Sequence, residues 1–419
     1  MHEHATSHNS VSPSVSKPLQ KFRRESLELL GWFALRAGMQ MLLVVVVAKL
    51  LGAIEYGYFV ATLATVSLFS PLAGLGLHAV IVRDGSLNPA SISTLTRQAL
   101  VIWWKSALIM SLFATVLAWL MLGGERSNLF SVLFFALGEI MTSSGVELVA
   151  RARQAQRNMR SFGALQAGLI FSRLFAIGFL SFTEEPKTHD WFLLYGAFSL
   201  GYLAIILSYA RFYLKGQTSP DKKMLRAGIP FWAGALSLRL QTEFNKPVLA
   251  QLSLSDTGSF NIAQKVIDMA TLPILAMQET LLPRLLSAGD NRKLFELAWF
   301  YLTVFALFMS LLILLIAPLI PSILGSEFEK AVVLVSALAW LPLFQVQRSI
   351  ANAKVIANGQ SDKLTSVYIL NALFAILIIL AAVQLWGTLG VVYAAYLSES
   401  ILTLALLKTF FHRKPACHD

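Results

Sequence analysis

Long apolar runs are the feature that most restricts how this chain of 419 residues can fold. Residues 39–48 and 374–383 are two examples among many, and a single water-soluble core could not bury so many of them. Hydrophobic residues make up 56% of the chain and charged residues only 14%, whereas an ordinary soluble domain is about a quarter charged. The chain is therefore predicted to be an all-α polytopic membrane protein, which excludes most soluble enzyme folds.

A membrane span needs roughly 20 mostly apolar residues, and at that length the chain has room for about twelve spans and only short loops. The apolar stretches and their polar breaks predict helices near residues 27–49, 57–82, 99–122, 129–150, 161–182, 191–211, 227–251, 258–282, 295–317, 331–353, 364–386 and 388–410.

The distribution of charge between the loops predicts the orientation. Most of the 34 basic residues precede the first span or follow an even-numbered span, whereas the opposite connections carry few basic residues and several acidic ones. By the positive-inside rule both termini are expected in the cytoplasm. The longest basic connection, 212–226, is expected to separate an N-terminal six-helix lobe, 27–211, from a C-terminal six-helix lobe, 227–411.

The tails, 1–26 and 412–419, are expected to be disordered and cytoplasmic. The single cysteine, Cys417, cannot form an intramolecular disulfide or a cysteine-based metal site. The sequence contains no DxD, HExxH, GxSxG or Walker motif, and no large external loop that could complete an active site. We therefore expect no enzymatic activity, no cofactor and no metal. A nucleic-acid partner is disfavoured because the basic residues are divided among short loops.

The two predicted lobes share a short motif. Residues 48–59 and 250–260 both contain A-x-L followed, with one gap, by [ED]-x-G-x-F. Transporters are often built from duplicated halves, and two halves that both begin inside are parallel repeats. The match favours an internal duplication.

Several segments resemble the Wzx-type polysaccharide flippases of the multidrug/oligosaccharidyl-lipid/polysaccharide (MOP) exporter superfamily. They are A-K-L-L-G-x-x-E-Y-G-x-F at 48–59, P-L-A-G-L-G-L at 71–77, G-I-P-F-W at 228–232, L-L-P-R-L at 281–285 and P-x-I-P-x-I-L-G-x-x-F-x-x-A at 318–331. The resemblance covers nearly the whole chain.

It implies two six-helix lobes around a central cavity that is lined mainly by spans one, two, seven and eight. The implied cargo is an undecaprenyl-diphosphate-linked oligosaccharide, moved across the bacterial inner membrane for O-antigen, lipopolysaccharide or exopolysaccharide synthesis. The implied partners are the lipid bilayer, a polysaccharide polymerase and glycosyltransferases. We expect a monomer.

Ionisable residues at membrane depth cost about 2.5–3.5 kcal/mol each on insertion scales, and usually face a cavity or a partner. Arg36 is predicted to lie roughly 13 Å inside span one at 1.5 Å per residue, with Gln40 one turn further on. Arg173 is similarly central in span five. Span seven places Arg239, Glu243 and Lys246 on one face, and span eight adds Lys265 and Asp268.

The functional interpretation is a hydrated cavity in which these cations hold a lipid diphosphate, because the guanidinium fork donates several hydrogen bonds to phosphate oxygens and stays charged. Glu243, Asp268 and Glu399 are candidate ion-coupling residues. The structural alternative is that Arg239–Glu243 and Lys265–Asp268 are only intrahelical ion pairs.

Two other functions compete with the flippase. A cation-coupled drug exporter of the same superfamily is expected to carry an acidic residue in span one, but no Asp or Glu lies between Glu28 and Glu55. A membrane glycan polymerase or ligase is disfavoured by the short loops.

Overall fold

The computed structural model describes residues 16–123, 128–213, 222–287, 292–357 and 361–411, and within them the backbone forms helices and short turns with no β-strand. The all-α prediction is confirmed. The N-terminal half contains α1 (Ser16–Ser67), α2 (Ser70–Gly74), α3 (Leu77–Leu87), α4 (Ile92–Leu122), α5 (Leu129–Ala155), α6 (Met159–Leu180) and α7 (Thr188–Tyr213). The C-terminal half contains α8 (Lys222–Glu243), α9 (Asn245–Ala250), α10 (Leu254–Ser287), α11 (Arg292–Ile316), α12 (Ile320–Leu324), α13 (Glu329–Leu338), α14 (Leu341–Ala357) and α15 (Ser361–Phe411). Short 3-10 turns lie at Pro89–Ser91, Ala317–Leu319 and Ser326–Phe328.

Seven helical segments of the described chain are long and apolar enough to cross a membrane, or eight if the bent pair Ser326–Leu338 and Leu341–Val355 counts as one span. Two of the seven, Gly31–Leu87 and Ser366–Thr409, contain 57 and 44 residues, so each has the length of two spans of about 20 residues. The helices α8 and α10 are not among the seven found in the described residues. The protein is a multi-pass membrane protein, and the count of twelve spans stays a prediction.

Glycines break the two longest helices where the sequence predicts a change of span. Gly52 has φ 74° inside α1, and Gly387 has φ 58° inside α15. Only glycine adopts this region without a penalty from Cβ, which is why the chain can turn there within a short distance.

The first helix begins earlier than predicted. α1 starts at Ser16, so residues 16–26 are helical rather than part of a disordered tail. Pro18 lies in the first turn, where its missing N–H costs no helical hydrogen bond, and the residues from 19 to 30 contain no other helix breaker. The rest of the predicted N-terminal tail, the C-terminal tail 412–419 and residues 214–221 of the basic connection lie outside the described residues.

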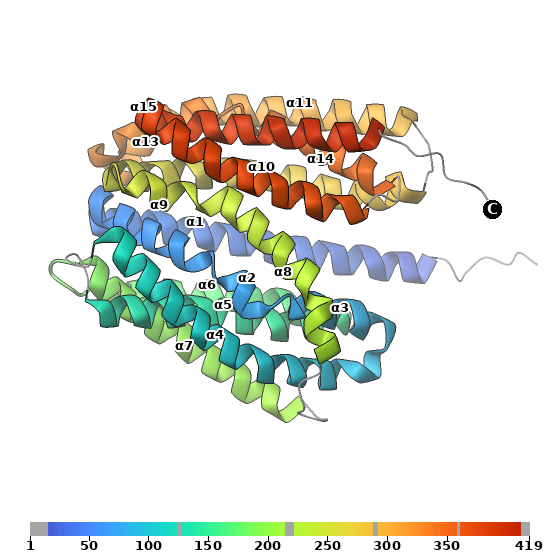
Figure 1. The fold of residues 1–419 in the computed structure, drawn as a ribbon. Helices are drawn as coiled ribbons and strands as arrows, with labels where there is room; N and C mark the ends of the chain where they lie inside the picture. Colours follow the sequence, from blue (N-terminus) through green and yellow to red (C-terminus); the bar gives the residue numbers. More distant parts are fainter. Residues whose placement is uncertain (1–15, 124–127, 214–221, 288–291, 358–360, 412–419) are drawn as a thin grey trace, which may run out of the picture.

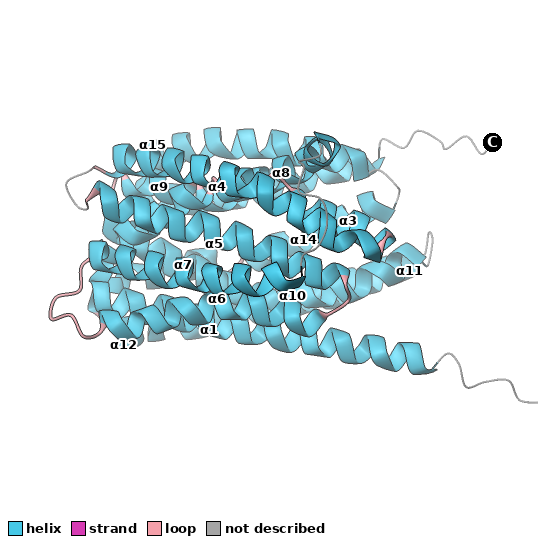
Figure 2. Ribbon diagram, turned by 90° about the horizontal axis from the view of Figure 1, so that it is seen from below, coloured by secondary structure: helices cyan, strands magenta, loops and turns pink. Residues whose placement is uncertain are grey.

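The helices form an elongated bundle in which α1 runs through the middle (Figure 1). On one side lie α4 to α7 of the N-terminal half, and on the other lie α10, α11 and α13 to α15 of the C-terminal half. Figure 2 shows the long helices running side by side along the same axis. Within this bundle α1 packs against α6 of its own half and against α10 of the other half.

The two ends of the bundle are named here for their loops. The basic end is where α1 begins and where α5 meets α6, beside Arg153 and Arg157. The acidic end is where α1 breaks at Gly52 and where α6 meets α7, beside Glu184.

Aromatic residues dominate the core of the N-terminal half. Phe135 stacks on Phe192 with ring centroids 4.6 Å apart and lies 4.8 Å from the Tyr195 ring. Phe59 of the [ED]-x-G-x-F motif packs edge-on against Phe135 and Trp191. Such pairs contribute about 0.5–1.5 kcal/mol each beyond the area they bury, so this cluster holds α1, α5 and α7 together as a unit.

Candidate functional site

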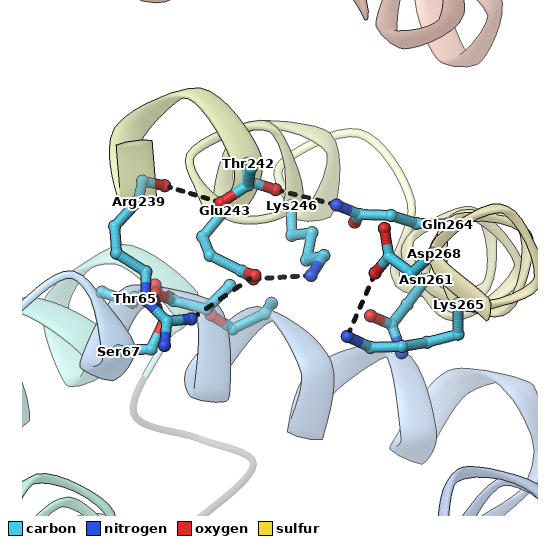
Figure 3. Close-up of polar contacts among 12 residues, drawn as sticks. Thr65, Ser67, Arg239, Thr242, Glu243, Lys246, Asn261, Gln264, Lys265 and Asp268 are labelled. Atoms are coloured by element: carbon cyan, nitrogen blue, oxygen red, sulfur yellow. Dashed lines mark hydrogen bonds and ion pairs between the residues drawn. The ribbon is translucent and has the colours of Figure 1, made fainter. Parts of the chain in front are cut away.

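The charged residues predicted on span seven lie together at the end of α8 (Figure 3). The Lys246 ammonium lies 2.6 Å from Glu243 Oε2, and an Arg239 guanidinium nitrogen lies 3.9 Å from Glu243 Oε1. Lys246 is 3% exposed and Glu243 14%, so this pair lies inside the protein. α8 ends at Glu243 and α9 begins at Asn245, and the turn at Phe244 keeps Lys246 on the same side as Glu243.

The polar residues of α10 extend this cluster. Lys265 Nζ lies 3.5 Å from Asp268 Oδ2, and the Gln264 amide donates to the Thr242 carbonyl at 3.2 Å, which joins α10 to α8. The Asp268 carboxylate keeps 49% of its side-chain surface exposed, and so does the Arg239 guanidinium. The cluster is therefore accessible rather than sealed. Figure 3 shows the Arg239 side chain pointing toward α1, where Thr65 and Ser67 lie.

Arg36 approaches the same region from α1. Its side chain is half-buried, and in the part of the chain that the structure describes no side chain forms a hydrogen bond or ion pair with it. The charged groups that act on it are Glu147, Arg173, Arg239 and Arg151, three of which are cations. Gln40 is half-buried one turn further along α1. A guanidinium with these neighbours and no ion-pair partner favours an anionic ligand.

Arg173 is held in a buried contact within the N-terminal half. One of its guanidinium nitrogens donates to Glu139 Oε2 at 2.6 Å, with side-chain exposures of 10% and 11%. The Tyr195 hydroxyl donates to the same carboxylate oxygen, and the guanidinium carbon lies 4.5 Å from the Tyr195 ring centroid. This arrangement supports a structural role for Arg173, since its charge is already paired.

Glu139→Ala is expected to lower the free energy of unfolding by about 3–5 kcal/mol, because it leaves the Arg173 guanidinium buried and unpaired. The double variant Glu139→Leu/Arg173→Met is expected to recover most of that loss, because an apolar pair can replace a buried ion pair at little cost. Thermal unfolding of the purified protein in detergent measures both. Equal loss in the single and double variants would contradict the structural assignment.

Glu399, a predicted ion-coupling residue, is also paired. Arg348 Nε donates to Glu399 Oε2 at 2.7 Å, and both side chains are about one-fifth exposed at 23% and 21%. The contact joins α14 to α15. Neither Glu399 nor Arg173 joins the cluster at the end of α8, which holds Arg239, Glu243, Lys246, Lys265 and Asp268. Arg36 lies outside this cluster, near both Arg173 and Arg239.

A second set of polar residues forms a connected group that the sequence does not predict. Glu147 accepts from Arg151 Nε at 2.6 Å and from the Gln166 amide, which ties α5 to α6. The signal was present in the i, i+4 spacing of Glu147 and Arg151. The contact with Gln166 joins two helices and follows from no sequence spacing.

Comparisons with known proteins agree with this architecture. A search of curated protein sequences found no significant match. Among solved structures, the lipid II flippase MurJ in an inward closed conformation has a TM-score of 0.69 at 14% identity, over 91% of this chain and 89% of that one. An inward-facing multidrug resistance MATE family transporter of the MOP superfamily has a TM-score of 0.66 at 14% identity, over 92% and 97%.

A MOP superfamily transporter from Pyrococcus furiosus, described as having a binding pocket of reverse polarity, has a TM-score of 0.62 at 15% identity, over 93% of both chains. At these identities the similarity shows a common fold. The sequence profile of the family described as "Polysaccharide biosynthesis protein" matches residues 46–296, which is more than half of the chain. The chain therefore belongs to the polysaccharide biosynthesis protein family, in agreement with the resemblance to the Wzx-type proteins, and it has the fold of MurJ and of the MATE family transporters.

Proposed function

We propose that this protein moves an undecaprenyl-diphosphate-linked oligosaccharide across the bacterial inner membrane by alternating access, for polysaccharide biosynthesis. The observation that carries the proposal is Arg36, a half-buried guanidinium on the central helix without an ion-pair partner in the described chain. A cation in this position is costly unless a ligand neutralises it. A diphosphate suits it, since the guanidinium fork matches phosphate oxygens and keeps its charge.

The other half supplies a second cation. Arg239 belongs to the C-terminal half and is close enough to Arg36 for the two charges to repel each other. Half of its side-chain surface is exposed. One cation on each half supports a diphosphate site between the two parts that must move relative to one another. This arrangement supports a transport cycle in which the headgroup is held by both halves at once.

Two amide oxygens near these charges lack a hydrogen-bond donor in the described chain, and sugar hydroxyls are suitable donors for them. Gln264 Oε1 and Asn245 Oδ1 are buried, and neither has a hydrogen-bond partner in the described chain. Buried polar atoms are normally paired, so two free acceptors beside the charged cluster favour a ligand with hydroxyl donors. Gln40 on α1 is the corresponding amide near Arg36. We assign this group to the glycan part of the cargo.

The proposal extends to ion coupling, orientation and partners. Glu243 and Asp268 remain the proposed coupling carboxylates, because both lie beside lysines whose pairing a bound ion or proton would change.

The basic loops favour cytoplasmic termini. A polymerase and glycosyltransferases are the proposed partners, and the family and structural relatives support transport rather than catalysis.

The purified protein should be stabilised against heat by undecaprenyl diphosphate, and more weakly by undecaprenol, which lacks the charged headgroup. Tetraphenylphosphonium, a lipophilic cation, is the matched probe for the drug-exporter alternative. Stabilisation by the diphosphate lipid alone supports the flippase. Stabilisation by the cation alone would contradict it and favour the exporter.

A further inference from the structure

The two copies of the [ED]-x-G-x-F motif meet at the acidic end. Gly57 of α1 and Gly258 of α10 lie at the point where the helices cross. A methyl group on Gly57 would lie 1.8 Å from the Leu254 carbonyl oxygen, and one on Gly258 would lie 2.9 Å from the Ala53 carbonyl oxygen. The helices of the two halves therefore touch through their backbones, and the Tyr56 ring packs beside Gly258.

The acidic residue of each motif copy is fixed within its own half. Glu55 accepts hydrogen bonds from the Thr188 hydroxyl and, at 3.3 Å, from the Thr188 N–H at the start of α7. Asp256 accepts from the Thr388 hydroxyl just after the break in α15, and from Lys330 Nζ at 2.7 Å. These equivalent contacts support an internal duplication. They also make each side of the crossing a rigid part of its own half.

A separate set of side-chain contacts crosses between the halves. The break at Gly52 leaves the Ala53 N–H available, and it donates to Glu327 Oε2 of the C-terminal half at 2.9 Å. The next residue, Phe328, packs edge-on against Tyr56 with ring centroids 6.1 Å apart. The Tyr56 hydroxyl in turn accepts from the Asn261 amide at 2.6 Å.

We propose that this crossing is the gate at the acidic end and that Glu327 is its latch, a positioning residue that holds the two halves closed. The inference rests on the alternating-access function proposed above. Because the two backbones are in direct contact at the glycine crossing, it opens only when the halves separate. The bonds that must then break are the side-chain contacts across the seam, and the Glu327 bond joins a charged carboxylate to a backbone N–H.

Side-specific thiol labelling tests the latch directly. In a Cys417→Ser background, a reporter cysteine at Thr242 lies in the charged cluster beyond the gate. Sealed vesicles that expose the acidic end are treated with a membrane-impermeant maleimide. A hydrogen bond to a charged group shifts an equilibrium by roughly ten- to a hundredfold, so Glu327→Ala should raise the labelling rate at least about tenfold.

Glu327→Gln should give an intermediate rate, since its amide oxygen still accepts from the Ala53 N–H. Glu329→Gln is the matched control, because Glu329 is exposed two residues along the chain and takes no part in the seam, and it should leave the rate unchanged. A rate in Glu327→Ala equal to that of the parent would overturn the latch.

A cross-link across the seam gives an independent test. A short bifunctional thiol reagent that joins Tyr56→Cys to Asn261→Cys should abolish labelling of the reporter from the acidic side, and cleavage of the reagent should restore it. The control pair Trp299→Cys/Gln347→Cys lies within the C-terminal half, where the parent residues are hydrogen-bonded at 2.7 Å. Cross-linking this pair should change nothing.

Unchanged labelling after cross-linking the Tyr56/Asn261 pair would overturn the gate. Both readouts report motion and require no cargo, so the gate can fail while the flippase assignment stands. The assignment itself fails separately, in the ligand experiment above.

Discussion

Arg36→Ala is expected to weaken binding of undecaprenyl diphosphate at least about tenfold, because a hydrogen bond to a charged group contributes about 1.5–3 kcal/mol. The effect should be large since the guanidinium has no competing ion-pair partner in the described chain, so all of its donors are available to the ligand. Arg36→Lys should retain part of the affinity, because it keeps the charge but loses the planar fork. The measurement is lipid binding to purified protein by native mass spectrometry.

Lys49→Ala is the matched control for this experiment. Lys49 lies on the same helix, is exposed, and is close to the break at Gly52 rather than to the charged cluster. Its removal should leave diphosphate affinity unchanged. Equal affinity in Arg36→Ala and the parent protein would show that Arg36 does not touch the headgroup. A parallel loss in Lys49→Ala would point to a general electrostatic effect instead of a site.

Lys246→Met is expected to lower the free energy of unfolding by about 3–5 kcal/mol, because it removes the closest counter-charge of the buried Glu243 carboxylate. The present pair joins Lys246 Nζ and Glu243 Oε2 at 2.6 Å, and Lys246 is 3% exposed. The double variant Lys246→Met/Glu243→Leu should recover most of the stability. Thermal unfolding in detergent, followed by tryptophan fluorescence, measures these differences.

The same double variant separates folding from transport. If Glu243 couples an ion to transport, the double variant should fold normally and still transport poorly, because the coupling carboxylate is gone. A double variant as unstable as Lys246→Met would contradict the assignment of a mutually compensating pair. A stable double variant with full transport would remove Glu243 from the proposed coupling residues.

The fold could be predicted from the sequence because a membrane leaves few choices. Apolar length determines where helices lie, and every backbone polar group must be satisfied within a helix. The breaks in α1 and α15 fall between predicted spans because the lengths of the apolar stretches determine where each span ends. The start of α1 at Ser16 differs from the prediction of a disordered tail, because a polar segment without helix breakers can extend a membrane helix beyond the bilayer.

The candidate site could be predicted only in part. The spacing along predicted span seven places Arg239, Glu243 and Lys246 on one face, and the structure brings them together as expected across the turn from α8 to α9. Contacts between helices are not encoded in spacing along one helix. The sequence therefore could not reveal that Arg173 is bound by Glu139, or that Glu327 reaches the Ala53 N–H. Both contacts depend on how distant helices pack.

The flipping of lipid-linked glycan in cells tests the central claim most directly. Cells that lack the gene are complemented with the parent protein, with Arg36→Ala or with Lys49→Ala at equal expression, and glycan linked to undecaprenyl diphosphate is quantified on each membrane face. We predict accumulation on the cytoplasmic face in the deletion strain and with Arg36→Ala, and clearance with the parent and Lys49→Ala. Normal surface glycan in the deletion strain, with altered sensitivity to cationic compounds, would contradict the flippase and favour the drug exporter.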